Sequence, residues 1–523
     1  MSTNPLTSAT KPKTTGKDAL QGSIEKAKSH NLVFGIVGHV GAGATYVAAA
    51  LSEELESTGY QTLRIKPSEL IAQMGTQLNL IPANSLHGVK HQRTDLLQKA
   101  GDELRKRYGP TIVASLAINH IHVVRKQIEP QNKPVAFIID SLKHPHEVKA
   151  LQEVYRNSFY LLSVICGPEL RLLRLKQKYK ETTEQVRREL ANHDEASPKE
   201  EGQSDYKQNT RDTLQHADFF VSNEEDNDPQ TLASTLSRII HIITGQTTIR
   251  PTRDERGMHA AWSAALRSTC LSRPVGAAIL NEAGELIATG TNDVPKPGGG
   301  LYQDGESKDA RCFSYKEKQP KGYCRNDFTK KLIYKEIFTS LQSAKLLKDG
   351  AEPQLVQKAI EQTSVRDLIE FSRAVHAEMD AILSLARSGG ETTQNATLYS
   401  TTYPCHSCAR HIVGSGIREV VYIEPYQKSR AKELHPDSIE ETTKRWTPNS
   451  EKVHFRLFSG VAPRRFAAVF QRYSKLKDAE GLLIERAPNA LHQDPVFSRD
   501  LAEFEMKVAE YVNGLTNRGD GGP

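Results

Sequence analysis

The segment TTYPCHSCARHIV, residues 401–413, combines a helix-start pattern with residue types that bind metal. Cys405 and Cys408 are spaced i, i+3 and follow Pro404, a residue favoured in the first turn of a helix. We therefore expect both thiols to face the same way at a helix N-terminus, where the thiolate form is stabilised. The next residues, GSGIREVVYIEPY (414–426), predict a glycine stop followed by a strand. The two thiols are thus expected on a helix that leads into a strand of an α/β fold.

A second segment, AVHAEMDAIL (374–383), supplies the rest of the expected metal site. Three ligands, His376, Cys405 and Cys408, would leave the fourth position of a tetrahedral Zn²⁺ open, as catalytic zinc sites do. Glu378 stands at the start of a predicted helix, where it can move protons without binding the metal. A lone CxxC is also typical of a redox pair or of half a structural zinc site. Together the two segments match the H-x-E and P-C-x-x-C signature of zinc deaminases, which we favour.

The segment RSTCLSRPVGAAILNEAGELIATGTNDVP (267–295) resembles the deoxycytidylate deaminase family, in which a helix and two strands end in a similar turn. This resemblance implies that Asn292 contacts the sugar of the substrate. The segment YPCHSCARHIVGSGIREVVYIEPYQKS (403–429) resembles bacterial anti-phage dCTP deaminases, which also carry a kinase-like P-loop domain. Lys428 and Ser429, a cation and a hydroxyl at a strand end, are expected phosphate contacts, and a solvated loop end is the equally open alternative.

The family resemblance implies a hydrolytic deamination of dCTP, dCMP or both, which yields the deoxyuridine nucleotide and ammonia and depletes deoxycytidine nucleotides in phage defence. It also implies a homo-oligomer and, in the anti-phage group, an inhibitory factor such as an RNA. A deaminase that edits nucleic acid is the main alternative, but it needs aromatic side chains for stacking, and aromatic content is only 7%. A nucleotide-binding protein with an inactive deaminase site is another alternative, although the three ligands and the glutamate are all present.

A glycine-rich loop, GIVGHVGAGATY (35–46), follows an apolar run and precedes a helical pattern. It has the form of a P-loop, which binds phosphate through backbone N–H groups and Mg²⁺ through a hydroxyl such as that of Thr45. Ala44 replaces the lysine that assists phosphoryl transfer, so we expect binding of ATP, GTP or a dNTP rather than kinase catalysis. A glycine-rich loop that only makes a tight strand–helix turn is the simpler alternative. Lys66 and Lys90 are candidates to supply the positive charge of the missing lysine from outside the loop. The expected nucleotide-binding residues are Gly38, Gly41, Gly43, Ala44 and Thr45.

The 523 residues are too many for one core, and the strand and helix patterns fall into two groups. They predict an α/β fold with an N-terminal P-loop kinase-like doubly wound parallel sheet and a C-terminal cytidine-deaminase-like α/β/α sandwich. Helices are expected at 329–347 and 353–386, just before the thiols. The expected units are a disordered N-terminus at 1–28, the kinase-like domain at 29–248, the deaminase domain at 252–440 and an extension packing on the deaminase domain at 441–523.

Composition is that of an ordinary globular protein, with 37% hydrophobic residues, 25% charged residues and a net charge of +6. No stretch is apolar for long enough to span a membrane, and the polar start lacks the apolar core of a secretion signal, so we expect a cytoplasmic protein. Basic residues are interleaved with acidic ones, which favours a solvated surface over a nucleic-acid stripe. Cys312 and Cys324 are expected to be free thiols, with a second metal site as the less favoured alternative.

Overall fold

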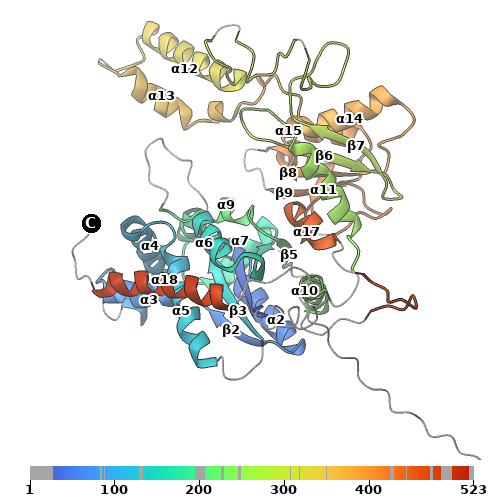
Figure 1. Cartoon of the computed structure of the whole chain (residues 1–523). Coiled ribbons are helices and arrows are strands. Elements are labelled where there is room, and N and C mark those ends of the chain that lie inside the picture. Colours follow the sequence, from blue (N-terminus) through green and yellow to red (C-terminus); the bar gives the residue numbers. More distant parts are fainter. Residues whose placement is uncertain are drawn as a thin grey trace, which may run out of the picture.

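Seven consecutive buried residues form β1 (Leu32–Gly38) at the centre of the first sheet of the computed structural model (Figure 1). The strand pairs in parallel with β3 on one side and β4 on the other. Helices cover both faces of this sheet, which explains why its central strands are apolar without alternation. The described residues are 28–82, 85–87, 89–128, 134–194, 206–224, 229–245, 249–306, 308–316, 319–348, 350–424, 429–442, 444–471, 475–484 and 498–517.

The first sheet has the strand order β12-β5-β4-β1-β3-β2, and β2 to β5 all run parallel to β1. One face packs against α2 and α10, and the other packs against α5 and α6. The strands after β1 are β2 (Gln61–Ile65), β3 (Val135–Leu142), β4 (Phe159–Ile165) and β5 (Phe219–Ser222). The helices are α2 (Ala44–Ser57), α3 (Pro67–Gln77), α4 (Lys90–Tyr108), α5 (Ile112–Ile128), α6 (Pro145–Tyr155), α7 (Pro168–Lys178), α8 (Glu184–Asp194), α9 (Thr210–Leu214) and α10 (Pro229–Thr244).

The second sheet has the order β10-β11-β9-β8-β6-β7. Strands β8, β9, β11 and β10 are parallel, whereas β6 is antiparallel to both β7 and β8. Helices α14 and α15 cover one face and α11 covers the other. The strands are β6 (Gly276–Leu280), β7 (Leu286–Thr291), β8 (Thr397–Thr402), β9 (Glu419–Glu424), β10 (Ile439–Glu441) and β11 (Val453–Leu457). The helices are α11 (Arg253–Ala265), α12 (Arg325–Ser343), α13 (Pro353–Glu361), α14 (Ala377–Ser388), α15 (His406–Gly414) and α16 (Ala431–Leu434). The expected α/β class is confirmed, with two sheets rich in parallel strands.

The C-terminal part joins both sheets instead of packing only on the second. Strand β12 (Gly460–Val461) adds an antiparallel edge to β5, and α17 (Phe466–Phe470) follows it. Helix α18 (Ser498–Asn517) lies along α5 (Figure 1), where Arg125 Nη2 donates a 2.8 Å hydrogen bond to the buried Glu505. The expectation that all of 441–523 packs on the deaminase domain is therefore wrong for this helix, because its apolar residues Leu501 and Val508 complete the core beneath the first sheet.

The helix expected at 353–386 is also wrong in part, because it is broken between α13 and α14. Thr363 accepts a hydrogen bond from Val365 N and caps a short 3₁₀ turn over Ser364–Asp367. The chain then stays out of the helical conformation until His376, which is extended at φ −73° and ψ 151°. This break places His376 at the N-terminus of a new helix.

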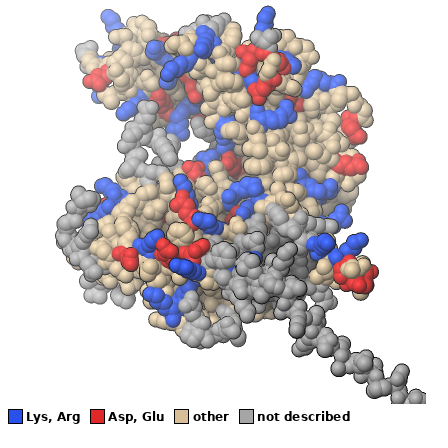
Figure 2. All heavy atoms as spheres, in the orientation of Figure 1, with Lys and Arg blue, Asp and Glu red and all other residues tan. Residues whose placement is uncertain are grey.

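The surface carries charges of both signs. On the face shown in Figure 2, Lys and Arg side chains of the described residues lie interspersed with Asp and Glu. In the same described part of the chain, no helix is both long and apolar enough to cross a membrane. The disorder expected for 1–28 concerns residues that, apart from Lys28, lie outside the described part of the chain.

Candidate active site

Two helix N-termini bring the expected ligands together. His376 is the N-cap of α14 and Cys405 is the N-cap of α15, so both side chains project from the first turn of a helix. His376 Nδ1 lies 3.2 Å from Cys405 Sγ and 3.3 Å from Cys408 Sγ. The three ligand atoms all lie within 4.8 Å of one another.

This donor set fits zinc. One imidazole nitrogen and two thiol sulfurs are typical of catalytic zinc sites, which keep one position open for water or substrate. Cys405 and Cys408 are only 6% and 1% exposed, so the ligands are held by the packed core under the second sheet. The sulfur of Cys405 also accepts a hydrogen bond from Cys408 N at 3.4 Å, which fixes it on the helix start.

Of the three ligand side chains, only Cys405 has a pKa shifted toward its metal-binding form. Hydrogen bonds to Cys408 and His376 lower the pKa of the Cys405 thiol to about 4. The pKa of Cys408 is raised, first because its thiol shares a hydrogen bond with Cys405 and then because it is buried. The hydrogen bond to Cys405 raises the pKa of His376 to about 9. Cys405 is thus held as a thiolate, the form in which cysteine binds a metal.

Glu378 lies beside the ligands without being one of them. Its carboxylate accepts a hydrogen bond from Ser400 Oγ at 3.2 Å through Oε1 and contacts Cys408 Sγ at 3.5 Å through Oε2. Burial raises the pKa of Glu378, and the negative charge of Cys405 raises it further. A raised pKa brings a carboxyl group closer to neutral pH, where it can both take up and return a proton.

A cavity of about 190 Å³ opens onto these residues, and we call it the substrate cavity. His376, Glu378 and Cys405 form its floor, and the ends of β7 and β8 contribute Asn292 and Thr402. The rest of the wall comes from the segment before β6 and from the non-helical stretch before α14. These lining residues are Cys270, Ser272, Arg273, Ile369 and Ser372 among others, and α12 adds Asn326.

Asn292 lines the substrate cavity, but the backbone holds its side chain. Its Oδ1 accepts from Val275 N at 2.7 Å, and its Nδ2 donates to Arg273 O at 2.9 Å. Next to it, Thr291 N donates to Asp380 Oδ2 at 3.1 Å, which ties the end of β7 to α14. The contact with the sugar that the family resemblance implies remains a prediction, and the observed role of Asn292 is to brace the segment before β6.

Arg273 is a cavity residue that sequence reasoning missed. Its guanidinium donates to Glu424 Oε2 at 2.6 Å and to Thr402 Oγ1 at 2.8 Å, so it links the ends of β8 and β9. A guanidinium on the wall of this cavity could pair with the phosphate of an anionic substrate. Its position directly before a predicted strand was the available signal, although many arginines occupy such positions.

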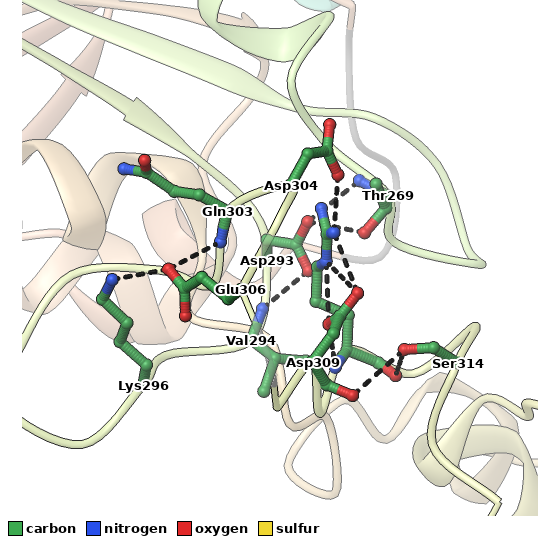
Figure 3. Close-up of polar contacts among 10 residues, drawn as sticks. Thr269, Asp293, Val294, Lys296, Gln303, Asp304, Glu306, Asp309 and Ser314 are labelled. Carbon is green, nitrogen blue, oxygen red and sulfur yellow. Dashed lines mark hydrogen bonds and ion pairs between the residues drawn. The ribbon is translucent and has the colours of Figure 1, made fainter.

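The loop after β7 is held by charged groups (Figure 3). Asp293 accepts from Thr269 N at 3.0 Å and from Val294 N at 2.8 Å. Farther along, Arg311 donates two hydrogen bonds to aspartates. Its Nε donates to Asp309 Oδ1 at 3.0 Å, and its Nη2 donates to Asp304 Oδ1 at 2.6 Å. The hydrogen bonds to these two aspartates raise the pKa of Arg311. The polar side chains of this segment therefore hold the loop through their own hydrogen bonds.

The two expected phosphate contacts at the end of β9 lie apart from the substrate cavity or outside the described residues. Lys428 belongs to the part of the chain that the structure does not describe. Ser429 Oγ donates to Pro404 O at 2.7 Å, and Ser429 lines a different cavity that reaches the first sheet. Cys312 and Cys324 carry no disulfide, and their assignment as free thiols stays a prediction.

The glycine-rich loop lies between β1 and α2. Gly41 and Gly43 adopt φ of 93° and 85°, which L-residues avoid, and Ala44 begins the helix. The pKa of Asp140, at the end of β3, is raised by burial, and a hydrogen bond with Thr45 opposes that shift. Lys143 Nζ donates to Gly38 O at 2.7 Å, so a lysine that sequence reasoning missed lies beside the loop.

Comparison with known proteins places the second sheet in a known family. Residues 251–424 match the family model described as cytidine and deoxycytidylate deaminase zinc-binding region. The deoxycytidylate deaminase of Enterobacteria phage T4 is 30% identical over 33% of this chain and 78% of its own length. The deoxycytidylate deaminase of Enterobacteria phage T2 is 31% identical over 33% of this chain and 80% of its own length. A solved dCMP deaminase from cyanophage S-TIM5, in complex with dCMP and dUMP, gives a TM-score of 0.23 at 18% identity over 40% of this chain and 99% of its own.

Proposed function

Because the chain belongs to the deoxycytidylate deaminase family and is a deoxycytidine nucleotide deaminase, we propose that it converts dCTP, dCMP or both to the deoxyuridine nucleotide and ammonia. The observation that carries this proposal is the His376–Cys405–Cys408 cluster beside the buried Glu378 at the floor of a cavity. These are the residue types and roles that hydrolytic deamination of a pyrimidine ring requires.

We assign His376, Cys405 and Cys408 as the zinc ligands. When bound there, zinc supplies a Lewis acid that lowers the pKa of water toward neutrality. The three side chains would hold the ion, and Cys405 would contribute the negative charge described above. The neighbouring core residues keep the ligands oriented, because Cys405 and Cys408 pack among the buried side chains beneath β8 and β9.

Glu378 carries the proton transfers. Its carboxylate takes a proton from the attacking water and delivers it to the ring nitrogen of cytosine. It then takes the remaining proton from the hydroxyl that has added to the ring carbon and passes it to the amino group, which leaves as ammonia. Ser400 Oγ holds one oxygen at 3.2 Å, which leaves the other on the side of the ligands. Burial helps, because the raised pKa of Glu378 brings the carboxyl group closer to the range in which it can return the proton.

We propose that Asn292 and Arg273 bind the rest of the substrate. Both line the substrate cavity, and the Asn292 side chain fixes the backbone of residues 273 and 275 beside it. Arg273 offers a cation for the phosphate, and Lys428 remains a proposed phosphate contact, whereas Ser429 lines the other cavity. The volume of about 190 Å³ suits a pyrimidine nucleoside more than a strand of nucleic acid.

We further propose that residues 29–248 form a P-loop kinase-like domain that binds a nucleotide with Mg²⁺ and regulates the deaminase. What supports this is the positive φ of Gly41 and Gly43, the contact of Thr45 with Asp140, and Lys143 beside Gly38. Because Ala44 takes the place of the usual lysine, the domain binds without transferring phosphate. Titration of the full chain with ATP, GTP and dNTPs in the presence of Mg²⁺ tests this, and binding to none of them would remove it.

We propose that the reaction serves phage defence by draining deoxycytidine nucleotides. This rests on the resemblance of residues 403–429 to anti-phage deaminases. It also rests on the presence of a glycine-rich loop and a deaminase site in the same chain. The test is expression of the chain or its Glu378→Gln variant in a bacterial host challenged with phage, with nucleotide pools measured. Equal plaque numbers with both proteins would contradict the defence role while leaving the enzymatic reaction standing.

A further inference from the structure

A second cavity, of about 350 Å³, lies between the two sheets, and we call it the interdomain cavity. The first sheet contributes His39 and Ala42 of the glycine-rich loop and Ser163 to Cys166 at the end of β4. The second sheet contributes Tyr422 to Glu424 at the end of β9. The volume falls in the range of small-molecule sites.

The position of this cavity in the first sheet is one at which α/β proteins bind ligands. From β1 the chain crosses to β2 on one side, whereas from β4 it continues to β5 on the other. Strands β1 and β4 therefore flank the point where the direction of connection changes, and their carboxyl ends leave a crevice there. The glycine-rich loop follows β1 into this crevice, and α2 begins directly behind it.

A buried hydroxyl independently indicates a ligand. Ser163 is fully buried, lines the interdomain cavity and has no hydrogen-bond partner for its Oγ among the residues that the structure describes. Buried hydroxyl groups are almost always paired, so an occupant with a polar atom at this place would complete the site.

The remaining lining matches the two chemical parts of a nucleotide. Arg171, whose Cγ and carbonyl oxygen approach Gly41, and Arg211 on α9 supply positive charge for phosphate groups. Phe220, Ile423 and Leu457 offer apolar contact for a flat base. Glu424 and Glu441 supply carboxylates that can accept hydrogen bonds from amino or hydroxyl groups of a nucleoside.

The interdomain cavity and the substrate cavity share a wall. Tyr403 lines both, and it stands two residues before the ligand Cys405. Its ring packs against that of Tyr422 at a centroid distance of 4.8 Å. Ser429 also lines the interdomain cavity and donates to the carbonyl of Pro404, the residue between Tyr403 and Cys405. An occupant can therefore shift the backbone that carries a ligand.

We propose that the interdomain cavity binds a nucleoside 5′-phosphate and that its occupancy changes the deamination rate through Tyr403 and Pro404. This inference rests on the deaminase function proposed above and names the site and the route of its regulation. The phosphate groups lie toward Arg171 and the glycine-rich loop, and the base lies among the apolar side chains near β9.

Two cysteines allow each cavity to be observed separately. Cys166 lines the interdomain cavity, Cys270 lines the substrate cavity, and both are partly exposed. The full zinc-loaded chain with Glu378→Gln, which prevents turnover, is treated with N-ethylmaleimide at pH 9 and each thiol is followed by peptide mass spectrometry. The probes are ATP, GTP, dTTP and dCTP, with inorganic triphosphate as the probe without a base and dCMP as the substrate probe. We expect at least one nucleotide to slow alkylation of Cys166 and dCMP to slow that of Cys270.

A charge reversal tests the assignment of the phosphate end. Arg211→Glu is expected to raise the Kd of the protecting nucleotide at least about tenfold. The matched control is Arg107→Glu on α4, a half-exposed arginine that does not line the cavity and should leave the Kd unchanged. In the active chain, the same nucleotide should change kcat/KM for dCMP by about fivefold or more, and Arg211→Glu should remove that change but keep the basal rate.

The two proposals fail in different ways. Deamination that proceeds while no nucleotide protects Cys166 would overturn the interdomain site and leave the enzyme standing. Protection by inorganic triphosphate equal to that by every nucleotide would overturn the base-binding part. Protection of Cys166 without any deamination of dCMP or dCTP by the active chain would overturn the proposed function and, with it, the regulatory route.

Discussion

Ser400 Oγ donates a hydrogen bond of 3.2 Å to Glu378 Oε1, so the proposed proton-transfer carboxylate is tied to strand β8. Ser400 is fully buried, and Glu378 is 4% exposed. The pair connects the helix that carries His376 to the strand that leads to Cys405. The orientation of the carboxylate is therefore part of the packed core and does not depend on a surface loop.

This bond predicts that Ser400→Ala lowers kcat about tenfold, or ~1.4 kcal/mol in the barrier, with KM nearly unchanged. The reason is that Glu378 loses its orientation while the walls that bind substrate remain. Zinc content should stay at the wild-type level. Ser384→Ala on the same helix removes a hydroxyl that donates only to Ala381 O, and it should keep full activity. An unchanged kcat for Ser400→Ala would show that the bond has no role in positioning Glu378.

Gly290 predicts a second effect on the metal site. A Cβ at this residue would overlap the backbone of Ala377 and Ala381, so α14 packs directly on β7 only because residue 290 is glycine. Gly290→Ala should push α14 away and lower both zinc affinity and activity. The matched control is Gly414→Ala at the end of α15, where a Cβ meets nothing within 4 Å. Equal zinc affinity of the two variants by competition with a chromophoric chelator would contradict this packing argument.

A buried ion network predicts a stability effect away from the cavity. Arg456 donates to Glu419 at 2.9 Å and to Asp254 at 2.9 Å, and Tyr399 Oη also donates to Asp254 at 2.9 Å. Arg456→Met leaves the buried Glu419 without its cation, while Asp254 keeps the hydrogen bond from Arg445 Nη2 at 2.9 Å, and stability should fall by about 3 kcal/mol. Arg430→Met breaks a fully exposed pair with Glu433 and should leave the thermal midpoint unchanged. Similar midpoints for the two variants in a thermal scan would contradict the role given to Arg456.

Cys166 predicts a pH dependence of thiol chemistry. Burial, followed by the charge of Glu224, raises the pKa of Cys166 to about 11. A raised pKa keeps the thiol protonated at neutral pH, and only the thiolate is nucleophilic, so alkylation should still accelerate between pH 9 and pH 10.5. Peptide mass spectrometry follows the site, and Cys166→Ser identifies its signal. A rate that reaches a plateau below pH 9 would contradict the raised pKa.

Much of the site was predictable because it lies on short, regular pieces of chain. Pro404 and the CxxC spacing predict the start of α15. His376 and Glu378 are only two residues apart, so both lie at the N-terminus of α14. The strand pattern of 32–38 likewise predicts β1, because a strand covered by helices on both faces is apolar throughout.

Other features depend on contacts between distant residues and carry little local signal. The break in the expected helix at 353–386 follows from a capping contact at Thr363. Arg273 becomes a cavity residue only because β8 and β9 bring Thr402 and Glu424 beside it. The position of α18 depends on a hydrogen bond between Arg125 and Glu505, residues that are far apart in the sequence.

The most direct test of the central claim is ammonia release by the purified, zinc-loaded chain with dCMP, dCTP, cytidine and single-stranded DNA offered separately. The control is Glu378→Gln, which keeps the three ligands and should retain zinc while its rate falls by about 10²-fold or more. We predict release from dCMP, dCTP or both, little from cytidine and none from DNA. Release from DNA alone, or an equal rate for the Glu378→Gln variant, would contradict the assignment of a nucleotide deaminase centred on Glu378.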